Sequence, residues 1–422
     1  MDASALSASR RRTVILVWLG WAVLMMGFQS FVQARFQLVR PDRVLPWTAT
    51  WTNADADRRH PYIRGPTLLG HTAWDSEFYI SIALHGYDDP AMAAASPQST
   101  PDDEIAGPKG DHPTWVSLNH AFFPGYPIAM GVVARPLMAL GMDPVGAATA
   151  AGTLVSLAAT LGAMLAIADL AAAGTAGEAD ATEGSARAIR AAFYLVVWPA
   201  AVFLAQVYSE ALFLAFSFGA LALMRRGAWG WAALLAAAAV FTRATGVLLV
   251  IPFGLTWLAE KPRSPGRALL ALAPIAAYLV WRWLLGADFD FTETRYFGRF
   301  PFALGASAEA WGQALGRLFG GAPASRAYEL VEFAGTAAAL VTALAHWRRD
   351  KALSLYSLAT FVVVATSGAA LGMHRYALAM PSLFLVPAGW GARAAFDRVW
   401  TLACALGLAA LTLAFSFGFW AG

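Results

Sequence analysis

Apolar segments of helical length recur along almost the whole chain, and they constrain its fold more than any other feature. Hydrophobic residues make up 58% of the 422 residues, whereas charged residues make up only 14%. A soluble domain cannot bury that much apolar surface, so the composition places most of the chain in a lipid bilayer. We predict an all-α polytopic membrane protein in which residues 1–422 form a single integral membrane domain. The apolar segments lie at residues 13–32, 126–141, 146–172, 190–207, 209–224, 229–244, 246–260, 268–286, 329–347, 352–371, 375–391 and 399–420.

Composition also excludes several classes of protein. A net charge of +3 is too small to indicate nucleic-acid binding. The single cysteine, Cys404, rules out a disulfide within the chain and disfavours a cysteine-based metal site. Residues 13–32 follow three arginines, and no small-residue cleavage site comes after them. We therefore interpret this segment as an uncleaved first span.

Basic residues between the apolar segments predict the topology, because cytoplasmic loops carry an excess of Lys and Arg. The basic loops share one side only if one segment does not cross, and residues 126–141 are the best candidate, being short and interrupted by Arg135-Pro136. We predict an embedded helix there, about 11 crossings, a cytoplasmic N-terminus and an external C-terminus. Alternatively, this helix crosses and one basic loop breaks the rule. The basic loops are at 10–12, Arg187/Arg190, Arg225-Arg226, Lys261/Arg263/Arg267, Arg348-Arg349/Lys351 and Arg393/Arg398.

Two long polar segments, residues 33–125 and 287–328, become external loops in this topology. The short junctions at 206–210, 242–246 and 372–376 face the same side and carry polar or charged residues that a plain helix turn does not require. We therefore expect a functional site on the extracytoplasmic face of a multi-pass protein of the cell membrane.

The first external loop contains Trp74-Asp75-Ser76-Glu77, followed by Phe78. Asp75 is our candidate general base, because a carboxylate at the membrane surface can take the proton of an attacking hydroxyl. Trp74 and Phe78 would hold it near an apolar wall. The alternative is that Asp75 caps a helix. Glu77 is either a supporting acid or a solvated residue.

Tyr208-Ser209-Glu210 places a carboxylate at the outer end of an apolar helix. Charged groups in such positions are costly, and they indicate function by default. Glu210 can bind acceptor hydroxyls or hold an arginine in place. Alternatively, it is a helix-start acid favoured by the helix dipole.

Arg243 and the run His374-Arg375-Tyr376 put cations on the external side, against the charge bias. An anionic partner explains this, because Arg binds phosphate with two parallel hydrogen bonds. Alternatively, each arginine is paired internally with Glu210 or Asp75. His120, in the turn-forming run Asn119 to Pro127, either contacts a phosphate or is structural.

Residues 287–300 alternate acids and aromatics, which suits a sugar-binding surface or a solvated loop, and Asp288-Phe289-Asp290 only weakly resembles a metal-binding pair. The chain contains no glycine-rich phosphate loop, Walker pattern or Cys/His metal spacing. We therefore expect no nucleotide-sugar or ATP site, no cofactor and no metal. An activated group would arrive already attached to a lipid.

Several of these motifs together resemble the PIG-V family of mannosyltransferases, in order and spacing, from about residue 70 to about residue 390. The resemblance implies a GT-C glycosyltransferase that uses a polyprenyl-phosphate-mannose donor on the extracytoplasmic face and inverts the anomeric carbon. It implies that Asp75 acts in catalysis, and that the partners are the lipid donor, the bilayer and a glycolipid or glycan acceptor. Residues 88–118 depart from the family pattern, which leaves the acceptor open. The motifs are Trp74-Asp75-Ser76-Glu77, His85-Gly86-Tyr87, Ala121 to Pro127, Tyr208-Ser209-Glu210, Arg243-x-x-Gly246 and Arg375-Tyr376.

Two alternatives belong to other classes of protein. A transporter or flippase of a lipid-linked saccharide would also need many spans and external cations. Transporters usually show a polar site at the midplane and paired repeats, and the sequence shows neither clearly. A non-catalytic partner subunit of a mannosyltransferase is the third possibility.

Overall fold

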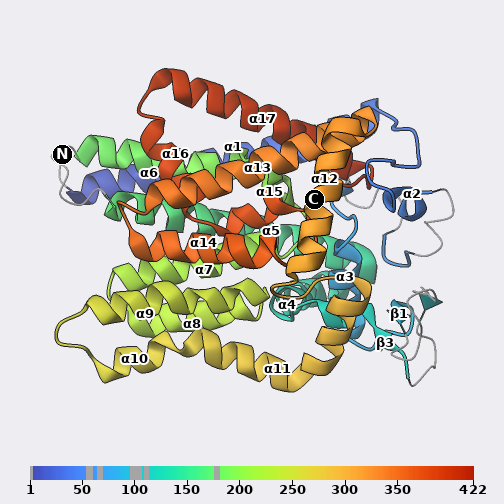
Figure 1. Cartoon of the computed structure of the whole chain (residues 1–422), viewed down its shortest axis with the longest axis horizontal. Helices are drawn as coiled ribbons and strands as arrows, with labels where there is room; N and C mark the ends of the chain where they lie inside the picture. The colour runs from blue at the N-terminus through green and yellow to red at the C-terminus, as the bar shows by residue number, and fades with distance from the viewer. Residues whose placement is uncertain (1–2, 54–59, 64–69, 96–106, 109–113, 175–180) are drawn as a thin grey trace.

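The structure is a computed structural model, and it describes residues 3–53, 60–63, 70–95, 107–108, 114–174 and 181–422. Most helices run side by side along the long axis of the molecule, while α12 (Leu304–Gly320) lies across one end of the bundle (Figure 1). The all-α prediction is confirmed for this part of the chain, apart from one small sheet. That sheet joins β1 (Ala93–Ala95) to β2 (Gly107–Pro108) and β3 (Val116–Ser117), both antiparallel, in the order β2-β1-β3.

The other elements, in chain order, are α1 (Ala3–Arg35), α2 (Thr48–Trp51), α3 (Ser76–His85), η3 (Leu118–Ala121), α4 (Gly125–Ala139), α5 (Pro144–Ala173), α6 (Ala181–Val197), η4 (Pro199–Ala205), α7 (Glu210–Arg225), α8 (Trp229–Val240), η5 (Ala244–Leu249), α9 (Val250–Ala259), α10 (Pro265–Ala271), α11 (Ala273–Phe291), η6 (Thr292–Tyr296), α13 (Pro323–His346), α14 (Lys351–Ala365), α15 (Met373–Tyr376), η7 (Ala377–Ala379), α16 (Ser382–Trp390) and α17 (Ala394–Ser416). The segment η6 is a π-helical turn, and the other η elements are 3₁₀ helices.

Ion pairs define one end of the bundle, which we call the basic end. Asp169, near the end of α5, binds Arg10 of α1 at 3.2 Å and also Arg226, just after α7. Arg225 binds Asp350 at the start of α14. Loops that the sequence assigns to the cytoplasmic side are therefore neighbours in space. The opposite end, which carries α12 and the small sheet (Figure 1), is called the site end.

The direction of the chain bears on residues 126–141. Helix α1 starts at the basic end, and its Gln29 reaches Gln206 near the site end with a hydrogen bond of 3.3 Å. Helix α5 ends at the basic end, so α5 must begin at the site end. The chain thus enters and leaves α4 at the same end. This supports the prediction that α4 does not cross, and its 15 residues would span only about 22 Å. Whether α4 is embedded in a bilayer stays a prediction.

Four helices in the described part are long and apolar enough to cross a membrane, and six spans result if each of two bent helix pairs counts as one. The predicted segment 190–207 is one such pair, since α6 and η4 meet at 81°. The predicted segment 375–391 is divided among α15, η7 and α16. Many of the predicted crossings are built from short or interrupted helices, which helix length alone does not identify as membrane spans. The number of about 11 crossings therefore stays a prediction.

The broken backbone before α7 is satisfied by side chains of neighbouring helices. Ser156 of α5 donates to the carbonyl of Gln206 at 2.6 Å, and Thr160 of α5 donates to the carbonyl of Leu204 at 2.9 Å. Irregular backbone inside a membrane protein needs such partners, because no water is there to replace them. This arrangement fixes the position of the residues that follow, Tyr208 to Glu210.

Candidate active site

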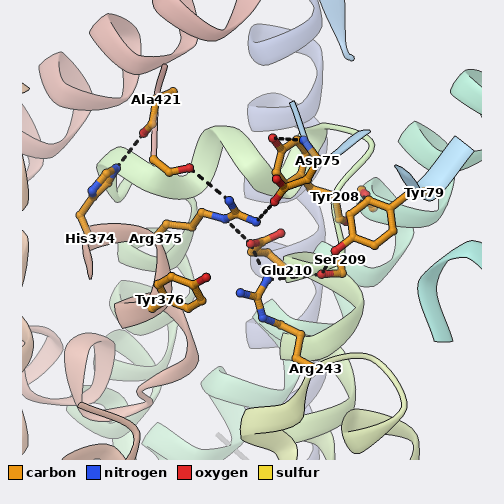
Figure 2. A network of polar contacts seen from close by, with 12 residues as sticks. Asp75, Tyr79, Tyr208, Ser209, Glu210, Arg243, His374, Arg375, Tyr376 and Ala421 are labelled. Atoms are coloured by element: carbon orange, nitrogen blue, oxygen red, sulfur yellow. Dashed lines mark hydrogen bonds and ion pairs between the residues drawn. The ribbon is translucent and has the colours of Figure 1, made fainter. Parts of the chain in front are cut away.

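Asp75 lies at the site end, at the N-cap position of α3, but its side chain makes no capping bond. Its carboxylate instead accepts a hydrogen bond from Arg375 Nη2 at 2.7 Å, and a quarter of the side chain remains exposed. Its backbone N–H donates to the Tyr208 hydroxyl at 3.2 Å. The Asp75 side chain therefore does not cap the helix. Its carboxylate points into a charged network (Figure 2).

Arg375 joins the two carboxylates of this network. Its Nη2 binds Asp75 and its Nε binds Glu210, while Nη1 donates to the carbonyl of Gly422 at 3.1 Å. The side chain is only 7% exposed. One planar guanidinium can make these three contacts in fixed directions, which an ammonium cannot.

Arg243 approaches Glu210 from the other side. Its Nη1 lies 2.6 Å from Glu210 Oε1 and 3.3 Å from the Ser209 hydroxyl. The Arg-x-x-Gly spacing has a steric reason, because a Cβ on Gly246 would lie 2.6 Å from the backbone nitrogen of Val240. The predicted internal pairing of both arginines is thus observed, and it brings the two cations into one site.

Aromatic rings surround the arginines. The centre of the Arg375 guanidinium lies 4.7 Å from the Tyr208 ring, and that of Arg243 lies 5.1 Å from the Tyr376 ring. Arg299 also packs on Tyr376, at 5.0 Å, and donates to its hydroxyl. Cations over aromatic faces are stabilised by the ring quadrupole, especially where water is scarce.

Trp74 fixes the approach of the chain to Asp75. It adopts a φ of +52°, which is strained for an aromatic residue. Its indole donates to the carbonyl of Phe419 at 3.3 Å, and its ring packs against Trp47 and Trp420 at centroid distances of 5.7 and 5.2 Å. These contacts compensate for the strain and hold Asp75 beside Arg375.

A small cavity adjoins the network. Its polar lining comes from Glu210, Arg243 and Arg375, and its apolar lining includes Phe213 and Leu378. The cavity thus brings the two guanidinium groups together with apolar side chains.

Two residues predicted for the site, Glu77 and His120, have other contacts in the structure. Glu77 is buried and binds His60 Nδ1 at 2.6 Å, so it holds the segment around His60 and is not a solvated acid. His120 is buried, its Nδ1 donates to the Ser117 carbonyl at 3.1 Å, and its Nε2 lies 3.8 Å from Asp288. Neither joins the Arg375 network, because α3 and η3 turn these side chains toward other neighbours.

His374 is adjacent to Arg375 but faces away from the cavity. Its Nε2 lies 2.9 Å from the carbonyl of Ala421, and its Nδ1 lies 3.0 Å from Glu332. The side chain is completely buried. These contacts position α15, so His374 orients its neighbour Arg375 and does not line the cavity.

The weak metal signal at Asp288 and Asp290 has another explanation in the structure. Asp290 binds Arg282 about two turns earlier in α11, with Nη2 at 2.6 Å. Among the described residues, no group of three or more His, Cys, Asp or Glu side chains is placed to hold a metal ion. Much of the segment 88–118 lies outside the described residues, and its described part contributes the small sheet.

Glu293 is a charged residue near the site that the sequence did not single out. It lies in η6, and its carboxylate is within electrostatic reach of Arg299, Asp75 and Arg243. Burial raises the pKa of Glu293 to about 7, and the nearby Asp75 charge adds to the effect. In the sequence, Glu293 is one of several acids among the aromatic residues at 287–300, and nothing in that pattern distinguishes it from the others.

Comparisons with known proteins agree with the motifs. Residues 112–255 match the family model described as mannosyltransferase (PIG-V). The GPI alpha-1,6-mannosyltransferase 2 of Mus musculus is 30% identical over 221 residues, which cover 51% of this chain and 37% of the mouse protein. The predicted resemblance to the PIG-V family is thereby confirmed. The match to the family model includes Glu210 and Arg243, whereas Asp75 and Arg375 lie outside it.

A solved structure also aligns with the chain. The crystal structure of the Archaeoglobus fulgidus oligosaccharyltransferase tethered with an acceptor peptide covers 95% of this chain and 55% of that chain. The TM-score is 0.38 and the sequence identity is 12%.

Proposed function

We propose that this relative of the PIG-V mannosyltransferases is itself a mannosyltransferase, which moves mannose from a polyprenyl-phosphate-mannose donor to a hydroxyl of a glycolipid or glycan. The observation that carries the proposal is the network of Asp75, Arg375, Glu210 and Arg243. It puts a partly exposed carboxylate beside Arg375, which Glu210 joins to Arg243, and both arginines line a small cavity. The family match supplies the class of reaction, and the network supplies a place for it.

Asp75 takes the role of general base. Its Oδ2 is held by Arg375, so the partly exposed carboxylate can accept a proton at Oδ1 without losing its orientation. The acceptor oxygen attacks C1 of mannose as its proton passes to Asp75. The bond between C1 and the phosphate oxygen breaks, and polyprenyl phosphate leaves with the electron pair. Attack from the face opposite the phosphate inverts the anomeric carbon.

Arg243 and Arg375 take the role of the phosphate site. Arg243 uses Nη1 for Glu210 and Ser209, which leaves its other N–H groups for phosphate oxygens. Cations placed at the leaving phosphate stabilise the charge that develops in the transition state. Glu210 holds both arginines in place through hydrogen bonds to Arg243 and Arg375.

The site end is proposed to be extracytoplasmic. The basic loops gather at the other end, and positive loops favour the cytoplasm. Both long polar segments contribute residues at the site end, with Asp75 from the first and Glu293 from the second.

The test is a transfer assay with purified protein in lipid nanodiscs, radiolabelled polyprenyl-phosphate mannose and crude membrane acceptors. Asp75→Asn keeps the shape of the side chain and removes the base, so we expect transfer to fall by about 10²- to 10⁴-fold with little change in melting temperature. The matched control is Asp290→Asn, since Asp290 pairs with Arg282 and is more than half exposed. Unchanged turnover of well-folded Asp75→Asn would refute the base assignment.

The same preparation separates the alternatives. Reconstituted into liposomes, a flippase would move the labelled lipid across the bilayer without transferring mannose. A partner subunit would show neither activity until a second protein is added. Either result would overturn the proposed activity.

A further inference from the structure

Glu332 is a carboxylate buried in α13 that the proposed reaction does not use. Its side chain is only 1% exposed, and α13 packs beside the short helix α15. One oxygen, Oε1, accepts from the backbone N–H of Gly372 at 2.5 Å and from the Tyr328 hydroxyl. The other oxygen, Oε2, accepts from the backbone N–H of His374 at 3.3 Å and lies 3.0 Å from Nδ1 of its ring. A carboxylate buried so deeply is stabilised only by partners of this kind.

These contacts hold the turn that carries Arg375. Gly372 is the N-cap residue of α15, and its φ of +73° is a left-handed conformation that glycine adopts readily. Backbone N–H groups at the start of a helix have no acceptor within the helix, so they need one from elsewhere. Glu332 supplies it for Gly372 and His374. Arg375 comes next in the chain, and its side chain reaches Asp75.

The segment 420–422 is a second surface against which Arg375 lies, and Glu332 is linked to this surface as well. Arg375 Nη1 donates to a backbone oxygen of the segment at 3.1 Å. Tyr328, one turn before Glu332, donates to the carboxylate and accepts from the indole N–H of the segment at 2.9 Å. His374 donates from Nε2 to a carbonyl of the same segment, also at 2.9 Å (Figure 2). One buried carboxylate therefore supports both the turn of Arg375 and the backbone that Arg375 binds.

We propose that Glu332 is a positioning residue of the transfer reaction, which sets the place of the Arg375 guanidinium relative to the Asp75 carboxylate without touching the substrate. A group misplaced by about 1 Å can slow catalysis about 100-fold, so contacts behind the site can control its rate. This inference rests on the proposed function, in which Asp75 is the base and Arg375 contacts the leaving phosphate.

Glu332→Gln tests the carboxylate with almost no change in shape. Among the described residues, the carboxylate accepts three hydrogen bonds, and each oxygen accepts at least one of them. The NH2 group of glutamine must therefore face a donor, and the turn has to shift. We expect kcat for mannose transfer to fall about 10- to 100-fold. The KM of the donor should change little, because Arg243 keeps its bond to Glu210.

The matched control is Glu329→Gln, one turn earlier in α13. Glu329 is also a fully buried acid, but its ion pair is made at 2.6 Å with Arg317 of α12. Its replacement removes a buried charge from the same helix and leaves the bonds of Glu332 to α15 in place. We therefore expect Glu329→Gln to keep the wild-type kcat per folded molecule, even if its melting temperature falls.

Melting temperatures test the same link without any activity. They are measured in detergent for wild type, Glu332→Gln, Arg375→Lys and the double variant. If Glu332 positions Arg375, contacts already disturbed by one change cannot be lost again through the other. The double variant should then melt at least about 2 °C above the value obtained by adding the two single shifts. Glu329→Gln combined with Arg375→Lys should show additive shifts.

The outcomes separate this inference from the proposed function. A wild-type kcat in folded Glu332→Gln, an equal loss of kcat in Glu329→Gln, or additive shifts with Arg375→Lys overturns the role of Glu332 and leaves the transferase proposal standing. A wild-type protein that transfers no mannose overturns the proposed function, and the melting temperatures then still decide whether Glu332 positions Arg375. Should Glu332→Gln fail to fold, Tyr328→Phe removes one bond to the carboxylate and keeps the ring. A wild-type kcat in that variant would overturn the inference.

Discussion

At the residue scale, the site depends on how one arginine is shared. Arg375 lies 300 positions from Asp75 in the sequence and 165 from Glu210, and it binds both. Buried charges are stabilised only when they are paired and hydrogen-bonded. The same contacts that stabilise the fold therefore place the candidate base next to the candidate phosphate site.

Replacing Arg375 by Met should be costly for this reason. Asp75 loses its partner, and Glu210 keeps only Arg243, so uncompensated negative charge remains in a buried place. We expect destabilisation of about 3 to 5 kcal/mol, measured as a lower melting temperature in detergent. Arg263→Met is the control, since Arg263 is an exposed residue that donates to the carbonyl of Leu258 and packs on the Trp257 ring, with no carboxylate bound to it among the described residues. Equal melting temperatures for the two variants would contradict the assigned importance of the Arg375 pairs.

At the scale of elements, short and interrupted helices position the site. Helix α15 has only four residues, yet it carries both His374 and Arg375. It is held against the long helix α13, where Gly335 allows close approach. A Cβ at Gly335 would lie 2.6 Å from the Cβ of His374 and 2.9 Å from its Cα.

Gly335→Ala should therefore push α15 away from α13. Because overpacking usually costs about 1 to 3 kcal/mol, we expect a lower melting temperature. Mannose transfer should also fall, since Arg375 follows the displaced His374. Gly254→Ala in α9 is the matched control, because a Cβ there meets no atom within 4 Å. If both alanine variants behave alike, the packing of α13 on α15 does not control the site.

At the scale of the whole molecule, the arrangement of the two ends links topology to function. The start of α1, whose Arg10 pairs with Asp169, and the small sheet of the site end lie at opposite ends of the bundle (Figure 1). The chain enters and leaves α4 at the site end. The polar segment before α4 and the start of α5 therefore lie on the same side.

Labelling of single cysteines in intact cells tests this topology. In a Cys404→Ala background, an impermeant maleimide should label Gln313→Cys in α12 and Met142→Cys between α4 and α5 from outside. Arg348→Cys at the basic end should react only after the membrane is permeabilised. The three native residues at these positions are exposed, whereas Cys404 is buried. Labelling of Met142→Cys only after permeabilisation would show that α4 crosses the membrane.

Much of the candidate site could be predicted because its members are charged residues in unusual places. Glu210, Arg243 and Arg375 each stand at the edge of an apolar segment, where a charge is costly without a partner, and Asp75 directly precedes an aromatic-rich run. Glu77 and Glu293 show where such reasoning ends. Both are acids beside aromatic residues, but Glu77 binds His60 while Glu293 faces Asp75 and Arg243.

The sequence by itself determined the helical, membrane-bound character of the chain, because apolar length and the spacing of charges are local properties. It also determined the resemblance to the PIG-V family, which the comparisons confirm. Only the tertiary structure decided which charges face one another. Pairing between residues hundreds of positions apart depends on how the helices pack, and a one-dimensional pattern does not contain that packing.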